Sequence, residues 1–304
     1  MERTQSDSCS EAMTIAANID ASKTEHDENF PVASLLITPR LRSPILSFYR
    51  FARAADDIAD HPGLSESTKL EGLDALEDTL LGKSDKAKAA LPLRRVLAER
   101  GLAPIHPLDL LTAFRADVTK RRYANWIELM DYCRYSAMPV GRFVLDLHGE
   151  DEFTWTHSDP LCAALQVINH LQDCAKDYCA LDRVYLPLDM MKAQGTSVEA
   201  LASAKASSAL QACLRSIASK AAELLPQASK LPLAVQDARL GLETGIIVRL
   251  AHKLIALLMI RDPLSEHVHL TRLDAMLQAA HGAATTLAAR LVQPSASPRP
   301  GEKR

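Results

Sequence analysis

The chain has 304 residues, of which 47% are hydrophobic and 24% are charged, a composition typical of a soluble globular protein with a sizeable core. Its net charge of −3 provides no basic surface for nucleic acid, and it has neither a Cys/His finger nor an aromatic RNA-binding motif, so we expect no nucleic-acid partner. The longest apolar run, residues 246–260, is interrupted by Arg249, His252 and Lys253 and is shorter than the ~20 residues of a membrane span.

The two ends of the chain differ in composition from the rest. Residues 1–25 are polar and serine-rich without the apolar core of a targeting peptide, which predicts a disordered lead-in and a cytoplasmic protein. Residues 293–304 contain three prolines and a basic end, which predicts a disordered tail. We expect residues 26–292 to form one domain, in which residues 82–90 are a surface link between helices.

Between these ends the sequence predicts helices. Alanine, leucine and charged residues dominate, the chain has only 11 glycines, and alternating apolar-polar strands are nearly absent. Apolar residues recur at steps of three and four in residues 108–118 and 161–171, which is typical of helices with one buried face. Residues 240–258 are amphipathic and rich in apolar side chains, which predicts a central or wall helix. The fold class is therefore all-α, with helices long enough to enclose a cavity.

The first acidic motif lies in Ser47–Asp60, a stretch without glycine or proline, which we expect to be a helix that begins just after Pro44. Asp56 and Asp60 are four residues apart and share one face of this helix. Like charges at this spacing destabilise an isolated helix by about 0.2–0.5 kcal/mol. The aromatic residues just upstream indicate a buried surrounding, so the pair needs a counter-cation, and Mg²⁺ prefers such oxygen ligands.

A second acidic motif follows in Asn169–Asp177, a helix-compatible run that again sets two aspartates four residues apart. Either motif alone is typical of a solvated acidic turn, but two copies that face each other across a cavity would hold two or three Mg²⁺ ions and a diphosphate. The expected metal ligands are Asp56, Asp60, Asn169, Asp173 and Asp177.

This ordered set of motifs resembles the squalene/phytoene synthase family of trans-isoprenoid synthases over roughly residues 28–290. Within that family, the chain is most similar to the hydroxysqualene synthases of bacterial hopanoid biosynthesis. The resemblance implies a single-domain isoprenoid-synthase helical bundle around a central active-site cavity. The stretches that carry it are Glu28–Ser34, Phe48–Asp60, Tyr132–Arg142, Leu165–Asp177 and Arg183–Pro187.

The diphosphate head group needs cations in addition to metal. Arg53 precedes Asp56 by a short turn, where it could pair with diphosphate. The resemblance implies diphosphate contacts for Arg183 and Tyr185 and a head-group position for His26. Two alternatives are that Arg53 only offsets the acidic cluster and that Arg183 is a charge on a surface loop.

A prenyl diphosphate joins an apolar chain to a charged head, so an apolar tunnel must adjoin the metal site. The expected substrate-binding residues away from the head group are Phe30, Phe48, Tyr49, Phe51, Val140, Leu165 and Gln166, with core packing as the alternative for the apolar ones. Tyr132 matches a tyrosine near the reacting carbons, which makes it a catalytic candidate beside the four aspartates, and Tyr135 is the competing candidate. Gly141 would let a helix kink beside those carbons, or it is a packing glycine.

Gln172 stands where condensing members of the family usually have arginine, just before the second motif. An enzyme that joins two prenyl diphosphates must hold two charged heads, whereas one that handles presqualene diphosphate holds one. The expected reaction is therefore the Mg²⁺-dependent conversion of presqualene diphosphate and water to hydroxysqualene and diphosphate, in which Gln172 could also orient the water. Two alternatives are condensation of two farnesyl diphosphates to presqualene diphosphate, squalene or dehydrosqualene, and a non-catalytic helical assembly factor.

The expected partners follow from this reaction. They are the prenyl diphosphate itself, the inner membrane through a peripheral contact, and functional coupling to a presqualene diphosphate synthase and to a squalene-forming oxidoreductase. The peripheral contact is expected because the substrate is apolar and the sequence has no spanning segment.

Overall fold

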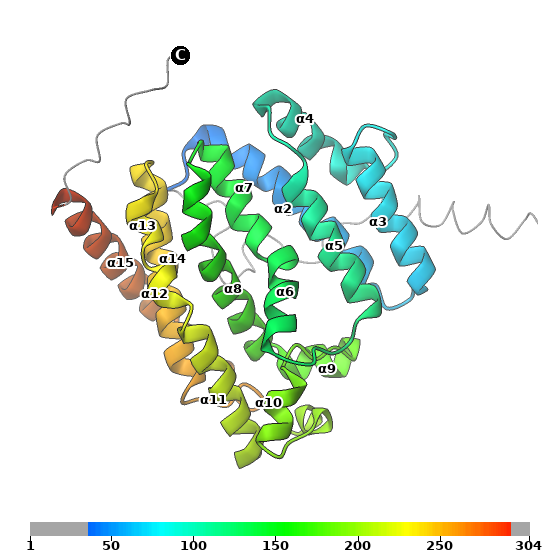
Figure 1. Cartoon of the computed structure of the whole chain (residues 1–304), viewed down its shortest axis with the longest axis vertical. Coiled ribbons are helices and arrows are strands. Elements are labelled where there is room, and N and C mark those ends of the chain that lie inside the picture. The colour runs from blue at the N-terminus through cyan, green and yellow to red at the C-terminus, as the bar shows by residue number, and fades with distance from the viewer. Residues whose placement is uncertain (1–35, 293–304) are drawn as a thin grey trace, which may run out of the picture.

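The computed structural model describes residues 36–292, and this part of the chain is built from helices (Figure 1). It has no strand; one isolated parallel bridge pairs Arg122 with Val184. The all-α prediction is confirmed. The elements are α2 (Pro39–Asp60), α3 (Glu66–Leu80), η1 (Lys88–Ala90), α4 (Leu91–Arg100), α5 (Ile105–Thr119), α6 (Trp126–Ser136), α7 (Met138–His148), η2 (Glu152–Thr154), α8 (Trp155–Gln172), α9 (Cys174–Leu181), α10 (Leu188–Ala193), η3 (Val198–Ala202), α11 (Ser208–Ala222), α12 (Leu225–Ala228), α13 (Leu231–Ala234), α14 (Ala238–Leu258) and α15 (Arg272–Val292).

Two groups of helices share the core, and α7 belongs to both. Phe143 and Leu147 on one side of α7 pack with α2, α3, α4 and α5. Leu145 on its other side packs with α6, α8, α11 and α14. Figure 1 shows α7 and α8 in the middle of the molecule, between α2 and α5 on one side and α13, α14 and α15 on the other. The two groups therefore form one continuous bundle.

Helix α2 begins earlier than the sequence predicted. It runs from Pro39 and contains Pro44, so the prediction that the helix begins just after Pro44 is wrong. A proline inside a helix has no N–H for the carbonyl four residues before it. That carbonyl, of Arg40, instead accepts a hydrogen bond from Nη2 of Arg100 at 3.1 Å. A side chain from α4 thus satisfies the carbonyl that Pro44 leaves open.

The second acidic motif does not lie on one helix. Helix α8 ends at Gln172, and Asp173 lies between it and α9 with φ −99° and ψ 6°. The prediction of one helical run is therefore wrong at Asp173. The one-turn spacing survives, because the N–H of Asp173 donates to the carbonyl of Asn169 at 2.9 Å and the N–H of Asp177 donates to that of Asp173 at 2.8 Å.

The link at residues 82–90 is less exposed than predicted. Ala87 and Ala90 are fully buried, and the N–H of Ala87 donates to Oγ1 of the buried Thr79 at 3.1 Å. The prediction of a surface link is wrong for these two alanines, because they fill the space between α3 and α4.

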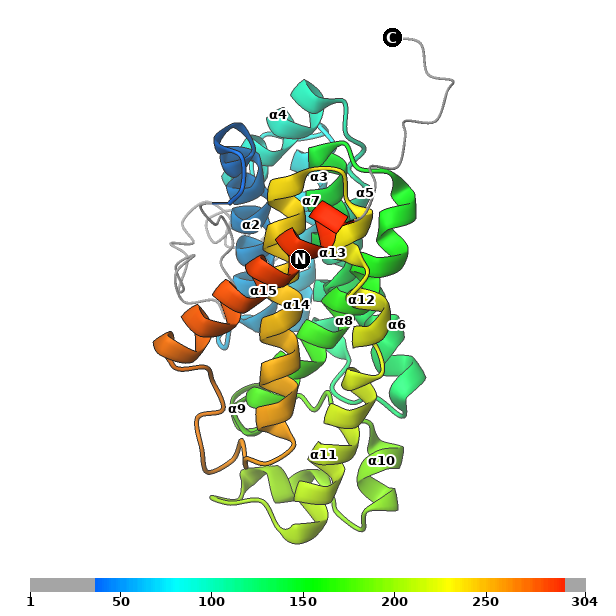
Figure 2. The same ribbon diagram turned by 90° about the vertical axis from the view of Figure 1, so that its left-hand side faces the viewer.

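Helix α14 is a wall helix, as predicted, and α15 crosses its outer side (Figure 2). The backbones touch where Gly245 meets Gly282: a Cβ atom on Gly282 would lie 2.8 Å from the carbonyl oxygen of Gly245 and 3.0 Å from Cα of Ile246. Any larger residue would separate the helices there. Within residues 36–292 no helix combines the length and the apolar character that crossing a membrane requires.

Replacing Gly282 with alanine should lower the melting temperature. Overpacking against a backbone costs about 1–3 kcal/mol, whereas alanine gains only ~1 kcal/mol over glycine inside a helix. Thermal unfolding followed by circular dichroism measures the difference. Gly63→Ala is the matched control, since its new Cβ would lie 3.5 Å or more from its neighbours. Equal melting temperatures for Gly282→Ala and the wild type would contradict backbone contact between α14 and α15.

Candidate active site

An apolar cavity of about 380 Å³ lies between α2, α7, α8 and α14. Its lining includes seven of the residues that the sequence assigned to the substrate or the metal: Phe48, Tyr49, Val140, Gly141, Leu165, Gln166 and Asn169. The ring of Phe48 stacks on that of Phe143, which also lines the cavity, with centroids 4.1 Å apart. Phe51 does not line it; this side chain is fully buried in the core between α2 and α5, as the packing alternative predicts.

Two of the wall helices lead from this cavity to the acidic motifs. Along α2 the lining ends at Ala52, one helical turn before Asp56. Along α8 it ends at Asn169, one turn before Asp173. Both motifs therefore lie beyond the same end of the cavity. This is the arrangement that a molecule with an apolar body and an anionic head requires.

The carboxylates of the two motifs influence each other. Burial, together with the negative charge of Asp60, raises the pKa of Asp56 to about 7. Burial likewise raises the pKa of Asp177 to about 7, with added repulsion from Asp173 and from Asp60 of the other motif. Because Asp60 acts on both, the motifs share one electrostatic environment. That environment holds more negative charge than the side chains around it offset.

Arg53 pairs with the first motif in this structure. Its Nη1 lies 2.5 Å from Oδ2 of Asp56 and its Nη2 lies 2.6 Å from Oδ1 of Asp57. The guanidinium therefore offsets the acidic cluster, as the alternative interpretation predicts. A contact with diphosphate stays a prediction for Arg53.

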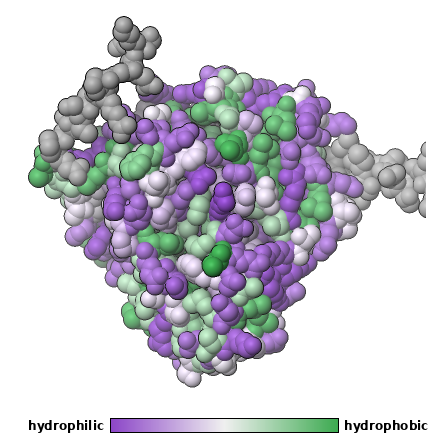
Figure 3. Space-filling view, in the orientation of Figure 1, coloured by the Kyte–Doolittle hydropathy of each residue, from purple (hydrophilic) through white to green (hydrophobic). Residues whose placement is uncertain are grey.

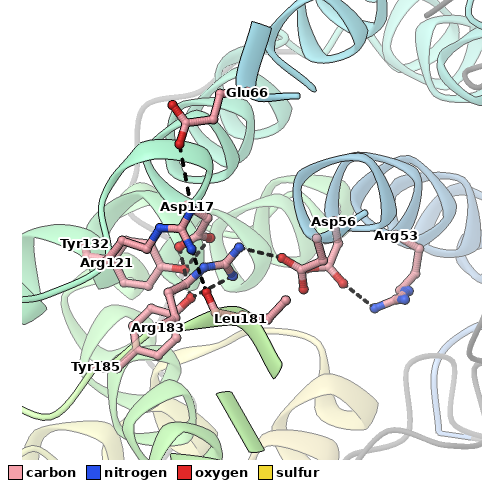
Figure 4. A network of polar contacts seen from close by, with 10 residues as sticks. Arg53, Asp56, Glu66, Asp117, Arg121, Tyr132, Leu181, Arg183 and Tyr185 are labelled. Carbon is pink, nitrogen blue, oxygen red and sulfur yellow. Dashed lines mark hydrogen bonds and ion pairs between the residues drawn. The ribbon is translucent and has the colours of Figure 1, made fainter. Parts of the chain in front are cut away.

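The side chain of Arg183 extends toward the first motif (Figure 4). It is only 6% exposed, so the alternative of a surface loop charge is wrong. Its Nη2 donates to Oδ1 of Asp60 at 2.7 Å, and its Nη1 donates to the hydroxyl of Tyr185 at 3.3 Å. A cation that follows the second motif in the sequence thus binds an aspartate of the first.

Asp117, on α5, is a member of this site that the sequence reasoning missed. Its Oδ2 accepts a hydrogen bond from the hydroxyl of Tyr132 at 2.8 Å, and its Oδ1 accepts one from Tyr185 at 2.9 Å (Figure 4). Burial raises its pKa to about 6, against the opposing effects of Arg183 and the two phenols. The sequence feature that could have revealed Asp117 is its place in the three- and four-residue repeat of α5, after the buried Leu110 and Ala113.

His170 and Lys69 were also missed. The imidazole of His170 stacks on the ring of Tyr185, with centroids 3.6 Å apart and planes at 13°. Burial, together with the charge of Arg183, lowers its pKa to about 3, so the ring is neutral at physiological pH. Lys69 on α3 is a further cation whose charge interacts with Asp60, although burial lowers its pKa. Lys69 belongs to no local motif, and His170 lies within the second acidic motif but outside its four-residue spacing, which is why spacing did not reveal them.

The remaining predicted residues have different outcomes. Gln172 donates from Nε2 to the carbonyl of Val268 at 2.5 Å, which ties α8 to the loop before α15, and its substrate role stays a prediction. Gly141 packs so closely that a Cβ would collide with Ser158 and Cys162, which favours the packing interpretation over a kink. Tyr132 and Tyr135 do not line the cavity. His26 and Phe30 lie outside the described residues.

The acidic end of the cavity fits a hard divalent cation by its donor set. Carboxylate and amide oxygens are the ligands that Mg²⁺ prefers. Burial first, and then repulsion from neighbouring aspartates, raise the pKa values of Asp56 and Asp177, and such an ion would favour their charged forms. Within residues 36–292, no three His, Cys, Asp or Glu side chains are grouped closely enough to hold a metal by themselves. An ion there would therefore draw its ligands from both motifs and from a bound diphosphate.

Comparison with known proteins identifies relatives of this chain. Residues 23–274 match the family model of squalene/phytoene synthase. The hydroxysqualene synthase of Rhodopseudomonas palustris is 55% identical, over 86% of this chain and 90% of the relative. That of Sinorhizobium fredii is 53% identical, over 91% and 95%. The crystal structure of the squalene synthase HpnC from Alicyclobacillus acidocaldarius superposes with a TM-score of 0.67 at 30% identity, covering 82% of this chain and 93% of that one.

Replacing Arg183 with glutamine should lower the free energy of unfolding at pH 8 by about 3–5 kcal/mol, the usual cost of removing one partner of a buried ion pair. The loss should shrink toward pH 5, because Asp117, with a pKa of about 6, then takes up a proton. Urea denaturation measures both. Arg121→Gln is the control, because Arg121 is 44% exposed and should cost at most about 1 kcal/mol. Equal losses in the two variants would contradict the linking role of Arg183.

Replacing Asp177 with asparagine should stabilise the metal-free protein at pH 8. When the pKa of a carboxyl is raised from 3.8 to about 7 in the folded state, the protein loses stability as pH rises from about 4 to about 7, and asparagine removes this loss. We expect a melting temperature about 2–4 °C above the wild type at pH 8 and a smaller gap at pH 5. Calorimetry in the presence of a chelator measures it, with the exposed Asp131→Asn as control. A variant that melts lower at pH 8 would refute the repulsion.

Proposed function

The chain belongs to the squalene/phytoene synthase family, and on this premise we propose that it converts presqualene diphosphate and water to hydroxysqualene and diphosphate. One observation carries the proposal: two acidic motifs share one electrostatic environment at the end of an apolar cavity. The two relatives that are more than 50% identical are both named hydroxysqualene synthase, which supports the choice of reaction within the family.

The cavity suits an apolar ligand. Its volume of about 380 Å³ falls within the range of small-molecule sites, and its walls are mainly aliphatic and aromatic. We propose that the hydrocarbon of presqualene diphosphate lies along α2 and α8, with its head group beyond Ala52 and Asn169.

We propose Mg²⁺ as the cofactor, held by Asp56, Asp60, Asn169, Asp173 and Asp177. Bound there, it would offset the charge of the diphosphate and favour its departure. The chain's own cations assist: Lys69 and Arg183 both lie close enough to interact with Asp60, and Arg53 lies beside Asp56. Each could shift from a carboxylate to the diphosphate as the leaving group develops negative charge.

The bond from carbon to the diphosphate oxygen breaks with its electron pair leaving on diphosphate. The cyclopropylcarbinyl cation rearranges, a water oxygen attacks it, and the water loses a proton to give the hydroxyl. Apolar walls protect the cation from other nucleophiles until then. Within the cavity, Ser136 offers a buried Oγ that has no hydrogen-bond partner among residues 36–292. With Gln166, which also lines the cavity, it is our candidate for holding the water, in place of Gln172.

Two alternatives are less well supported. Condensation of two farnesyl diphosphates would bring two heads to a site where Arg53 and Arg183 already pair with aspartates and where position 172 carries no charge. A non-catalytic assembly factor would not need both acidic motifs, and both are complete. We also propose, from the apolar substrate alone, a cytoplasmic protein with peripheral membrane contact. A presqualene diphosphate synthase would supply the substrate of this protein, and a squalene-forming oxidoreductase would consume its product.

The test offers presqualene diphosphate and farnesyl diphosphate separately to the purified chain, with and without Mg²⁺, in ¹⁸O-water. We expect Mg²⁺-dependent consumption of presqualene diphosphate and a C30 alcohol that carries the label in mass spectrometry. Asp56→Asn and Asp173→Asn should reduce turnover by about a hundredfold or more, while Asp131→Asn should not. An unlabelled C30 hydrocarbon, or comparable turnover of farnesyl diphosphate alone, would contradict the proposal and favour condensation.

A further inference from the structure

Helix α15 turns its apolar side away from the protein, which reverses the usual arrangement of a surface helix. It buries only Gly282 and Thr286. Its inward side also carries Gln278, whose Oε1 accepts a hydrogen bond from Nε of Arg249 at 2.8 Å. Five of its large apolar side chains are between 52% and 78% exposed: Leu273, Met276, Leu277, Leu287 and Leu291.

These five residues form one continuous stripe, named here the outer stripe. At about 100° per residue, all of them fall within roughly 60° of the direction opposite Gly282. The exposed Ala280 and Ala284 lie between them, so no polar side chain interrupts the stripe. On the face shown in Figure 3, by contrast, hydrophobic residues are interspersed with hydrophilic ones. An uninterrupted apolar surface of this kind marks a contact site.

We propose that the outer stripe of α15 lies on an anionic lipid bilayer, with the helix in the plane of the interface. A second copy of the chain is the competing occupant, and the size of the stripe argues against it. A helix of 21 residues is about 30 Å long, and a stripe about 10 Å wide gives roughly 300 Å². A stable protein interface needs about 800 Å² from each partner. A lipid surface has no such threshold, because each apolar side chain partitions separately.

The charge distribution favours an anionic surface. Residues 272–304 carry five lysines or arginines and two acidic residues, a net charge of +3, whereas the remaining chain carries −6. Beside the stripe, Arg272 is exposed, while Asp274 accepts a hydrogen bond from Thr271. Arg290 is bound to the carbonyls of Pro232 and Val235 and does not count toward lipid contact. The net positive charge of this part of the sequence favours anionic over zwitterionic headgroups.

The inference deepens the proposed function, since the C30 chains of the substrate and of the product both dissolve in a bilayer. The test does not depend on turnover, however. It measures sedimentation of the full chain with vesicles of phosphatidylglycerol and phosphatidylethanolamine, and separately with vesicles of phosphatidylcholine. The variant is Leu277→Glu with Leu287→Glu. The matched control is Ile127→Glu with Phe153→Glu, which charges two residues that are 78% and 66% exposed on other elements.

We expect wild type and control to bind the anionic vesicles, and the α15 variant to bind them about tenfold or more weakly. Unfolding curves should show that all three proteins are folded. Three results would overturn the inference: no vesicle binding by the wild type, equal binding by both variants, or equal binding to phosphatidylcholine. A wild-type dimer in light scattering that the α15 variant converts to a monomer would assign the stripe to a second copy. Failure of the chain to use presqualene diphosphate would contradict the proposed function but leave this result standing.

Discussion

The buried guanidinium of Arg183 is the interaction on which the active-site end of the bundle depends. It faces the carboxylate of Asp60, the phenol of Tyr185 and the charge of Asp117, which come from different parts of the chain. Without a cation here, Asp60 would lose its ion pair and the buried Asp117 would keep only its hydrogen bonds from two phenols, and proteins tolerate uncompensated buried charge poorly. The neutral His170 fits the same logic, because a protonated imidazole stacked on Tyr185 would repel Arg183.

The acidic end of the cavity nevertheless holds more negative charge than its cations offset. This repulsion lowers the stability of the folded protein, and the proposed binding of a cation there accounts for it. A site made only for stability would not raise the pKa of two aspartates to about 7. Ligands that bring positive charge would stabilise the folded state by binding to it selectively. The apolar cavity needs no such compensation, since its walls continue the core on both sides of α7. Along both α2 and α8, the earlier residues line the apolar cavity and contribute to the core, and the later residues carry the charged groups of the candidate active site.

Local patterns predicted what local forces determine. Three- and four-residue periodicity gave the helices, and the spacing of Asp56 from Asp60 gave the shared face. The predictions were wrong where a group distant in sequence determines the local structure. Helix α2 continues through Pro44 because Arg100, sixty residues away, satisfies the carbonyl of Arg40. Asp117 and His170 join the site only because α5 and α8 converge on Tyr185. Periodicity in α15 was readable, but which of its sides meets α14 depends on two glycines in contact.

Helix α14 brings the two functional surfaces close together. Thr244 and Ile247 line the cavity, while Gly241 and Gly245 meet side chains of α15. Because packed helices lie about 8–10 Å apart, the outer stripe is separated from the cavity by the thickness of two helices, α14 and α15. Small residues at the contact keep that distance short. An enzyme whose substrate and product dissolve in lipid benefits from this arrangement, since a short path from bilayer to cavity limits the exposure of a C30 chain to water.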